Sequence, residues 1–513
     1  MRVVIIGAGL GGLSFGACAA RDGHEVVLID KNAEPGGVMT LAREGGFCFE
    51  QGPLILTDLL EEESVGGFLA ELGISLQTMR DDRGLSTPDF DLLPPEEYEG
   101  PDWRKKRLEA LFPADRKGIR AYYRFYDALM ELRFLSGQKK SLTNRLRTLR
   151  AYLAIRPYEN MNCREFTEKL FSDERLRLVF NGILADFCAD PEEVQCFTLP
   201  FVNTETAFDK RIPTEKGGKL YYPSYRYIVG GCQKLPEALC AYILSRGGQF
   251  LSQTVAQKVL IEDGRAVGVR LSDGREIKAD LVAGCGSARD FFTEQVGEEY
   301  LDDDYRKILR EFRPMEAVFM LHLGVNYDPS AFQKQSLCYY YGSYDLHRAV
   351  EKLRSSVYHE GKDGYLIYFP DRHAPAFAPP GCHCVTIYTV CPDRLREGDW
   401  ESRKERFADE LIRLAEEHLP GLSEHIVAKK IVTAEDYRRL THMKKSSFGG
   451  VVPVWKQRNP PHLTPVKNLI FLGQQSENGG GVPIVLNGAR DAYQKAGLGR
   501  KEAGPGETGP RGT

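Results

Sequence analysis

A glycine-rich turn close to the N-terminus constrains the fold of this 513-residue chain more than any other feature. The turn has the spacing G-x-G-x-x-G, and its glycines are Gly7, Gly9, Gly11 and Gly12. The apolar residues 2–6 before it predict a strand, and the small residues 13–21 after it predict a helix. Residues 25–29 (EVVLI) predict a second buried strand. This order of strand, turn, helix and strand is a βαβ unit.

The turn has a physical use in binding a dinucleotide. Gly7 permits a tight turn, Gly9 lets a pyrophosphate approach the backbone, and Gly12 lets the helix pack closely on the strand. The start of the helix offers free N–H groups and partial positive charge to phosphates. Asp30 ends the second strand, where a carboxylate accepts hydrogen bonds from ribose hydroxyls. The alternative is a glycine-rich helix turn that binds nothing.

The same residues also have some features of a signal peptide, because residues 3–20 carry no charge and follow Arg2. Glycines make a poor leader helix, and the strand at 25–29 is correctly placed for the βαβ unit. We therefore predict that the fold starts at residue 2, without a cleavable leader. No other run approaches the roughly 18 apolar residues of a membrane span.

A second glycine pair, Gly36-Gly37, follows Asp30, and the segment Phe49-Glu50-Gln51-Gly52-Pro53 comes soon after it. In these segments the chain resembles the FAD-dependent amine oxidase superfamily, and within it the phytoene desaturase and retinol saturase group. The group usually has arginine where this chain has Val38. The resemblance implies that FAD is the cofactor. It also implies cofactor contacts at Lys31, Gly36, Gly37, Val38, Gly52 and Pro53.

The resemblance continues at Gly230-Gly231, at the turn Ala378-Pro379-Pro380-Gly381, and at Val255-Ala256, which resembles the strand that contacts adenine. Near the C-terminus it covers Gly473 and the block Gly480, Gly481, Val482 and Pro483. These glycines let backbone lie against a flat ring, and Pro483 suits a first helical turn. A helix N-terminus there would stabilise an anionic reduced flavin. Glu477 departs from the pattern of the family before these glycines, and it would place an acidic side chain near the predicted flavin.

The α/β signals recur in three separate parts of the chain, so the predicted domains are discontinuous. We predict an α/β fold in which a Rossmann-like FAD-binding domain is interleaved with a mixed-sheet substrate domain and a helical cap. Residues 1–60, 225–310 and 445–500 form the first domain, and residues 60–225 and 310–445 form the second. The Gly- and Pro-rich tail, residues 501–513, is expected to be disordered.

Charge is distributed unevenly along a chain whose net charge is only -4. Residues 104–156 hold fifteen Lys/Arg and four Asp/Glu, a net +11, which leaves -15 for the rest. Leu142, Leu146, Leu149 and Leu153 share one helical face, and arginines flank them. Such a helix is typical of a peripheral membrane-docking element. The alternative is a solvated helix that packs its leucines inward. No pattern of stacking aromatics accompanies the charge, which argues against nucleic acid.

Cysteine spacing gives no indication of a metal centre. The twelve cysteines include no CxxC pair, and Cys382-His383-Cys384 lies in a run that reads as a strand. Alternation along a strand puts His383 on the face opposite both cysteines, so we expect packing and no metal. The thiols are typical of a cytoplasmic protein.

Three functions remain open. The first, implied by the resemblance, is desaturation or saturation of carbon–carbon bonds in a lipophilic isoprenoid, such as a carotenoid or retinoid, by hydride transfer to or from the flavin. The second is an amine oxidase or an alkene or steroid reductase, for which Tyr339-Tyr340-Tyr341 and Tyr221-Tyr222 are candidate cage residues. The third is a non-catalytic lipid-binding protein. No catalytic acid, base or nucleophile is identified from the sequence, and the oligomeric state is left open.

Overall fold

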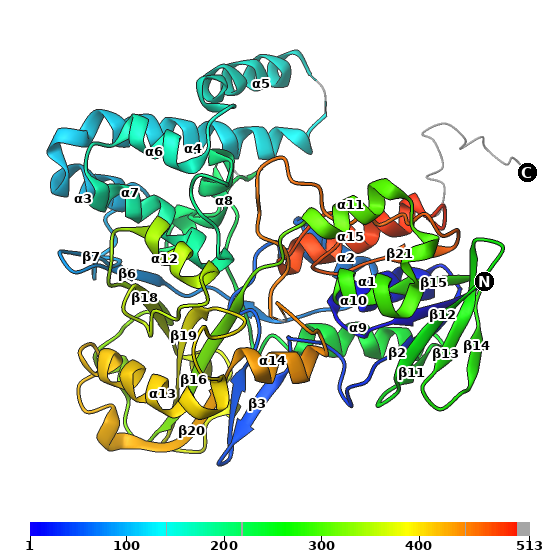
Figure 1. The fold of residues 1–513 in the computed structure, drawn as a ribbon. Coiled ribbons are helices and arrows are strands. Elements are labelled where there is room, and N and C mark those ends of the chain that lie inside the picture. The colour runs from blue at the N-terminus through cyan, green and yellow to red at the C-terminus, as the bar shows by residue number, and fades with distance from the viewer. Residues whose placement is uncertain (140, 217–218, 447, 500–513) are drawn as a thin grey trace, which may run out of the picture.

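The computed structural model describes the whole chain except residues 140, 217–218, 447 and 500–513. The predicted disordered tail, residues 501–513, therefore lies outside the described residues. The chain folds around two large sheets, one parallel and one mixed, with a layer of helices over the mixed sheet (Figure 1).

The parallel sheet has five strands from distant parts of the chain. Their order is β11 (Gln249–Leu251), β2 (Glu25–Ile29), β1 (Arg2–Ile6), β15 (Leu281–Gly284) and β21 (Leu469–Phe471). β1 lies at the centre because both of its edges are paired, Val4 with Val27 on one side and with Val282 on the other. All the strands fall within the three segments predicted for the cofactor domain, although the domain boundaries remain a prediction.

Alternate side chains of β1 point into two different cores, as the two-residue period of a strand requires. Val3 and Ile5 pack against α1 (Leu10–Arg21), α9 (Lys234–Ser245) and α15 (Val482–Lys495). Val4 and Ile6 pack on the opposite face. That face is covered by the sheet of β12 (Ala256–Glu262), β13 (Arg265–Leu271) and β14 (Glu276–Lys278), with α10 (Ala288–Asp290) and α11 (Asp303–Glu311). Burial on both faces explains the continuous apolar run of this strand.

The second sheet has seven strands and mixed directions. Its order is β20 (Ile426–Val432), β16 (Ala317–Val325), β19 (His383–Cys391), β18 (Gly364–Tyr368), β17 (Leu337–Tyr341), β6 (Arg83–Ser86) and β7 (Asp91–Leu92). Only β17 and β6 are paired in parallel among the described strands of this sheet. α13 (Trp400–Glu416) packs on one face. α12 (Leu346–Arg354) and α14 (Ala434–Thr441) contribute to the packing on the other.

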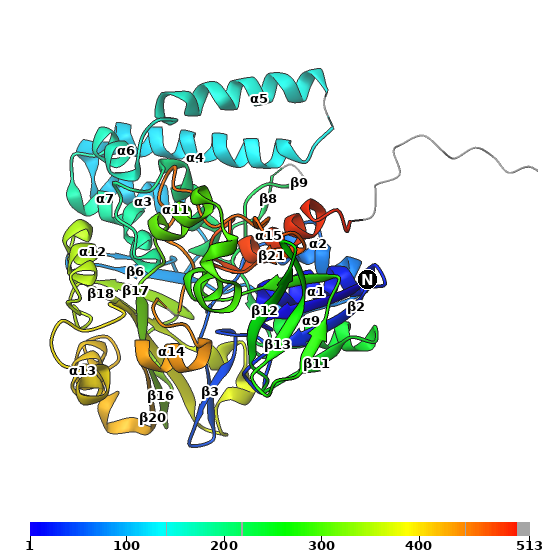
Figure 2. The ribbon, with the colours of Figure 1, turned by 45° about the vertical axis from the view of Figure 1, so that its right-hand side comes forward.

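A helical layer covers the end of the mixed sheet that carries β6 and β7. It consists of α3 (Trp103–Leu111), α4 (Arg116–Ser136), α5 (Leu142–Ile155), α6 (Cys163–Leu170), α7 (Glu174–Asn181) and α8 (Leu199–Val202). In both views α5 is the outermost helix of this layer and lies along α4 (Figures 1 and 2). The hairpin of β3 (Leu41–Glu44) and β4 (Phe47–Glu50), and the helix α2 (Ser64–Glu71), lie in the sequence between β2 of the parallel sheet and β6 of the mixed sheet. The predicted α/β class, with a mixed second sheet and a helical cap, is confirmed.

Candidate dinucleotide site

A candidate site opens at the carboxyl ends of the parallel strands, where ligands bind in open α/β sheets. It is a pocket of about 1290 Å³, a volume that includes the open solvent at its mouth. Many of the residues predicted to bind the cofactor line it: Gly7, Gly9, Gly11, Asp30, Lys31, Gly36, Gly37, Val38, Pro53, Ala256, Gly473, Gly481 and Val482. Both ends of the chain therefore contribute to one pocket.

The first glycine turn presents bare backbone to this pocket. Gly7 has a φ of +101°, and its N–H donates to the carbonyl of Ile29 at 2.8 Å. A Cβ on Gly9 would meet no atom within 4 Å, because this glycine faces the open pocket. A Cβ on Gly12 would lie 2.1 Å from the carbonyl oxygen of Gly7, so Gly12 permits the contact between α1 and β1 and does not line the pocket.

Asp30 is held at the end of β2 by its own hydrogen bonds. One carboxylate oxygen accepts the N–H of Ala8 at 2.7 Å, and the other accepts the N–H of Asn32 at 2.8 Å. A carboxylate oxygen has two acceptor positions, so each oxygen can still accept a ribose hydroxyl. Beside it, burial lowers the pKa of Lys31, which also lines the pocket.

The second glycine pair lies directly against the first turn. The N–H of Gly36 donates to the carbonyl of Ala8 at 2.8 Å, and Gly36 pairs with Gly9 in a short parallel bridge. Gly37 and Val38 continue along the pocket wall. Gly52 does not line the pocket: a Cβ there would lie 2.4 Å from the carbonyl oxygen of Val38, so this glycine permits the packing behind the wall.

The C-terminal glycine block brings a second helix to the same pocket. Gly481 is the N-cap of α15, with a φ of +100°, and Pro483 lies in its first turn. Gly480 packs against Gly450 and, like Pro483, is not in the pocket lining. α1 and α15 pack side by side through Phe15 and Tyr493, whose ring centroids are 5.4 Å apart. Neither helix has an acidic residue in its first turn, so two partly positive N-termini face one cavity.

A segment that the sequence analysis missed, 440–443 at the end of α14, forms part of the opposite wall. The amide of Asn32 donates to the carbonyl of Leu440 at 3.0 Å. The N–H of Lys444 donates to the carboxylate of Asp290 at 3.0 Å. We call residues 440–446 the strap, because they cross from α14 to the far side of the pocket.

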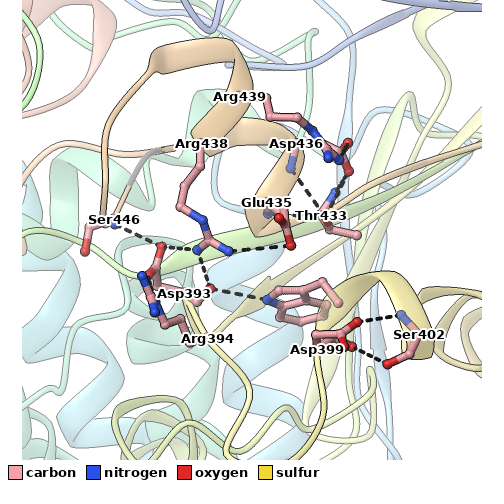
Figure 3. Close-up of polar contacts among 11 residues, drawn as sticks. Asp393, Arg394, Asp399, Ser402, Thr433, Glu435, Asp436, Arg438, Arg439 and Ser446 are labelled. Carbon is pink, nitrogen blue, oxygen red and sulfur yellow. Dashed lines mark hydrogen bonds and ion pairs between the residues drawn. The ribbon is translucent and has the colours of Figure 1, made fainter.

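The strap is fixed from behind by Asp393, as Figure 3 shows. The Asp393 carboxylate accepts the N–H of Ser446 at 3.0 Å and a guanidinium N–H of Arg438 at 3.0 Å. The main-chain carbonyl of Asp393 also accepts from Arg438, at 2.8 Å, and from the indole of Trp400, at 3.3 Å. Asp393 is buried, so this ion pair anchors both α14 and the end of the strap.

Residues 285–287, after β15, also line the pocket and were missed. Burial raises the pKa of the Cys285 thiol to about 12, so it remains a neutral thiol. The signal was the strand β15 followed by Cys285, Gly286 and Ser287, a second place where a strand of this sheet ends in a turn of small residues.

Three groups of residues that the sequence analysis singled out lie outside the lining of this pocket. Val255 is 38% exposed and outside the pocket lining, which includes Thr254 and Ala256 instead. Glu477 is exposed and pairs with Lys495 at 2.7 Å, so it does not place an acid in the pocket. The tyrosines proposed as a cage at the flavin also lie elsewhere. Tyr221 and Tyr222 pack in the helical layer, and Tyr339 and Tyr341 line a second pocket.

That second pocket, of about 620 Å³, lies between the mixed sheet and helices α7 and α12. Its lining is mostly apolar and aromatic, with Leu178, Tyr341, Leu353 and Val390 among the residues. Asp186 supplies a carboxylate, which accepts the hydroxyl of Tyr339 at 2.6 Å. Burial raises the pKa of Asp186 to about 6.

One apolar cluster joins the two pockets. Val38 and Leu440, on the wall of the dinucleotide pocket, pack against a set that includes Tyr339, Leu353 and Tyr388, on the wall of the second. The region between the two pockets is therefore apolar and contains few hydrogen-bonding groups.

The cysteine motif on β19 is engaged in ordinary packing. Nδ1 of His383 lies 2.9 Å from the carboxylate of Asp371, and the thiol of Cys384 donates to the carbonyl of Phe377 at 3.6 Å. All twelve cysteines are free thiols.

In the part of the chain that the structure describes, no helix is long and apolar enough to cross a membrane.

Comparisons with known proteins agree with this fold and site. A family model described as an NAD(P)-binding Rossmann-like domain matches residues 5–72. A chloroplastic prolycopene isomerase of an Oncidium hybrid is 24% identical, with 96% of this chain and 83% of the relative covered. A lycopene-forming phytoene desaturase of a Paracoccus species is 24% identical, with 96% of each chain covered. The crystal structure of an oxidoreductase from Methanosarcina mazei superposes with a TM-score of 0.63 at 18% identity, covering 96% of this chain and 100% of that one.

Fold, pocket and family model together define a protein built on a Rossmann-like dinucleotide-binding domain. The resemblance of its motifs to the phytoene desaturase-like group of the amine oxidase superfamily is confirmed by relatives that carry that name.

Proposed function

We propose that this chain is an FAD-dependent oxidoreductase that desaturates or saturates carbon–carbon bonds of a lipophilic isoprenoid of the carotenoid class. The observation that carries the proposal is the single pocket lined by Gly9 and Gly481, from opposite ends of the chain, and joined by apolar packing to a second cavity. Relatives named phytoene desaturase and prolycopene isomerase support the substrate class.

FAD fits the residues of the pocket. Asp30 would hold the ribose of the adenosine half, and the bare backbone at Gly9 together with the N-terminus of α1 would hold the pyrophosphate. Gly481 and the N-terminus of α15 would lie against the ring system. Val38 and Pro53 also line the pocket, so its wall continues past the glycine turn at residues 7–12. When bound, the flavin supplies hydride transfer.

The residues of the chain then have three tasks in the proposed reaction. The apolar cluster around Tyr388 excludes water and aligns an extended hydrocarbon. The start of α15 stabilises negative charge at the ring edge. The tyrosines considered as an aromatic cage do not line the dinucleotide pocket, so their positions give no support to the amine oxidase alternative.

The test begins with the purified protein, from which the cofactor is extracted and identified by mass and absorbance. The protein is then mixed without oxygen with a cis or trans polyene, and flavin bleaching and polyene products are followed. Bleaching with a more conjugated product supports desaturation, and pre-reduced protein giving a less conjugated product supports saturation. A change of double-bond geometry with no change in hydrogen count would replace the proposed reaction by isomerisation. A native protein that contains no flavin, and that binds none when FAD is added, would overturn the proposal.

The control is Asp30→Ala, which removes the carboxylate proposed to hold the ribose and leaves the apolar cavity intact. We expect this variant to lose flavin and all polyene conversion together. Conversion by the flavin-free variant would also contradict the proposal.

A further inference from the structure

α5 is attached to the molecule along one side only. It lies along α4 at the outer edge of the helical layer (Figures 1 and 2). Ala151 and Ile155 are the buried residues of the helix, and the guanidinium of Arg147 reaches inward to Glu131 at 2.8 Å. The remaining surface of α5 faces away from the body of the protein.

The outward surface is a stripe of leucines. Leu142 is 76% exposed, Leu146 61%, Leu149 53% and Leu153 54%. At 100° per residue these four positions fall within an arc of about 60°, on the side opposite Ala151 and Ile155. The alternative in which the leucines pack inward is therefore wrong. Large apolar side chains that share one exposed face mark an interaction surface.

Basic side chains border the stripe on both sides. Arg145 and Arg150 lie about 70° to either side of its centre, and both are exposed. Neither has an ion-pair partner among the described residues. From residue 139 to residue 158 the sequence contains six Lys/Arg and no Asp/Glu. The surface combines an apolar stripe with unpaired positive charge.

We propose that α5 docks on the surface of an anionic lipid bilayer, with its axis along the interface and its leucines among the acyl chains. An interfacial helix has this arrangement, in which apolar residues enter the lipid and Lys/Arg contact anionic headgroups. The inference rests on the surface of α5 alone and does not depend on the proposed function.

A second copy of the chain fits this surface less well than a bilayer. Two α5 helices brought face to face would place unpaired arginines against each other, with no acid on the helix to compensate. The helix is about 21 Å long and about 10 Å wide, so its footprint is roughly 200 Å², against about 800 Å² per partner in a stable interface.

The experiment is sedimentation of the full-length protein with vesicles of phosphatidylcholine and phosphatidylglycerol in equal parts. We expect the native protein to bind these vesicles and to bind pure phosphatidylcholine vesicles less. Leu146→Ser/Leu149→Ser should lower the partition coefficient at least about tenfold. The matched control is Leu244→Ser/Leu463→Ser, which changes two leucines that are also exposed but lie on other parts of the surface. This control should bind like the native protein.

A second pair of variants tests the charge. Arg145→Gln/Arg150→Gln should weaken binding to the anionic vesicles severalfold, whereas Arg310→Gln/Arg348→Gln, with the same loss of charge elsewhere, should not. Thermal melting of each variant reports whether it is folded. Native protein that stays in the supernatant, or α5 variants that bind unchanged, would overturn the proposal. So would a native dimer, seen by light scattering, that Leu146→Ser/Leu149→Ser converts to monomers, because a second copy would then cover the stripe.

Discussion

The side-chain amide of Asn32 donates to the main-chain carbonyl of Leu440 at 3.0 Å, which ties the two walls of the dinucleotide pocket together. Asn32 follows the carboxylate at the end of β2, and Leu440 starts the strap on the far wall. A ligand that fills the pocket would lie beneath this contact, so its strength should affect how fast the cofactor leaves.

Asn32→Ala should therefore speed the release of FAD. The substitution removes the hydrogen bond to Leu440 and a longer one, of 3.3 Å, between Nε2 of His442 and the side-chain oxygen of Asn32. A loss of at least about 1 kcal/mol predicts an increase of at least about fivefold in the dissociation rate. The rate is measured by diluting flavin-loaded protein into a flavin-binding competitor. Asn326→Ala is the control, because Asn326 bonds with His425 at the surface. Equal rates for the two variants would show that the strap does not hold the cofactor.

Asp393→Asn should lower both stability and flavin retention. The substitution leaves Arg438 without its buried counter-charge, and removal of one partner of a buried ion pair costs about 3–5 kcal/mol. Arg438 is 18% exposed, so water compensates in part and we expect the lower end of that range. Urea unfolding gives the free energy, and flavin fluorescence gives the retention. A change below about 0.5 kcal/mol would mean that the pair does not anchor the strap.

Gly9→Ala and Gly12→Ala should separate binding from folding. The methyl group introduced by Gly9→Ala would meet no protein atom within 4 Å, and Gly9 has an ordinary φ of -73°, so the apoprotein should keep its stability. The same methyl group would occupy the place proposed for the pyrophosphate, so flavin content should fall to background. The methyl group introduced by Gly12→Ala would collide with the carbonyl of Gly7 and should destabilise the fold itself. Flavin content and urea unfolding of both variants are the measurements, and full flavin content in Gly9→Ala would contradict the proposed phosphate site.

Asp186→Asn should stabilise the protein at neutral pH. Burial raises the pKa of Asp186 from 3.8 to about 6, so the folded state binds this proton more tightly than the unfolded state. Its contribution to stability is complete below about pH 4 and is lost as the pH rises through 6. Asparagine imitates the protonated acid, so the variant should gain at most about 3 kcal/mol at pH 7 and nothing at pH 4. Asp263→Asn, in the exposed turn after β12, is the control for urea unfolding at both pH values. If Asp186→Asn gained the same stability at pH 7 and at pH 4, the raised pKa of Asp186 would be contradicted.

The local sequence was sufficient to predict those strands and turns whose residue pattern has a single interpretation. The expected strands at 2–6 and 25–29 are β1 and β2 to the residue, because continuous apolar runs beside a glycine turn leave no other arrangement. The glycines that line the pocket were found for the same reason: only a bare backbone suits both the turn and the ligand.

Other parts of the site could not be predicted because they depend on tertiary contacts. The strap, residues 440–446, carries no motif, and its position follows from distant partners such as Asn32, Asp290 and Asp393. No strand was expected at residues 83–86, and β6 forms there because it pairs with β17, a strand more than 250 residues further along the chain. The helical periodicity predicted that Leu146 and Leu149 share one face of a helix. It could not predict whether that face packs on the protein or is exposed to solvent.

The dinucleotide pocket unites Gly9 with Gly481, and this has a consequence for biosynthesis. Gly481 is the 472nd residue that the ribosome adds after Gly9. Nascent chains would therefore have to collapse, pair β1 with β2 and cover the sheet with helices while the cofactor cavity still lacks one wall. If the cofactor is the proposed flavin, its binding can be completed only late in synthesis, and a chain that stops ahead of β21 should not be rescued by added riboflavin.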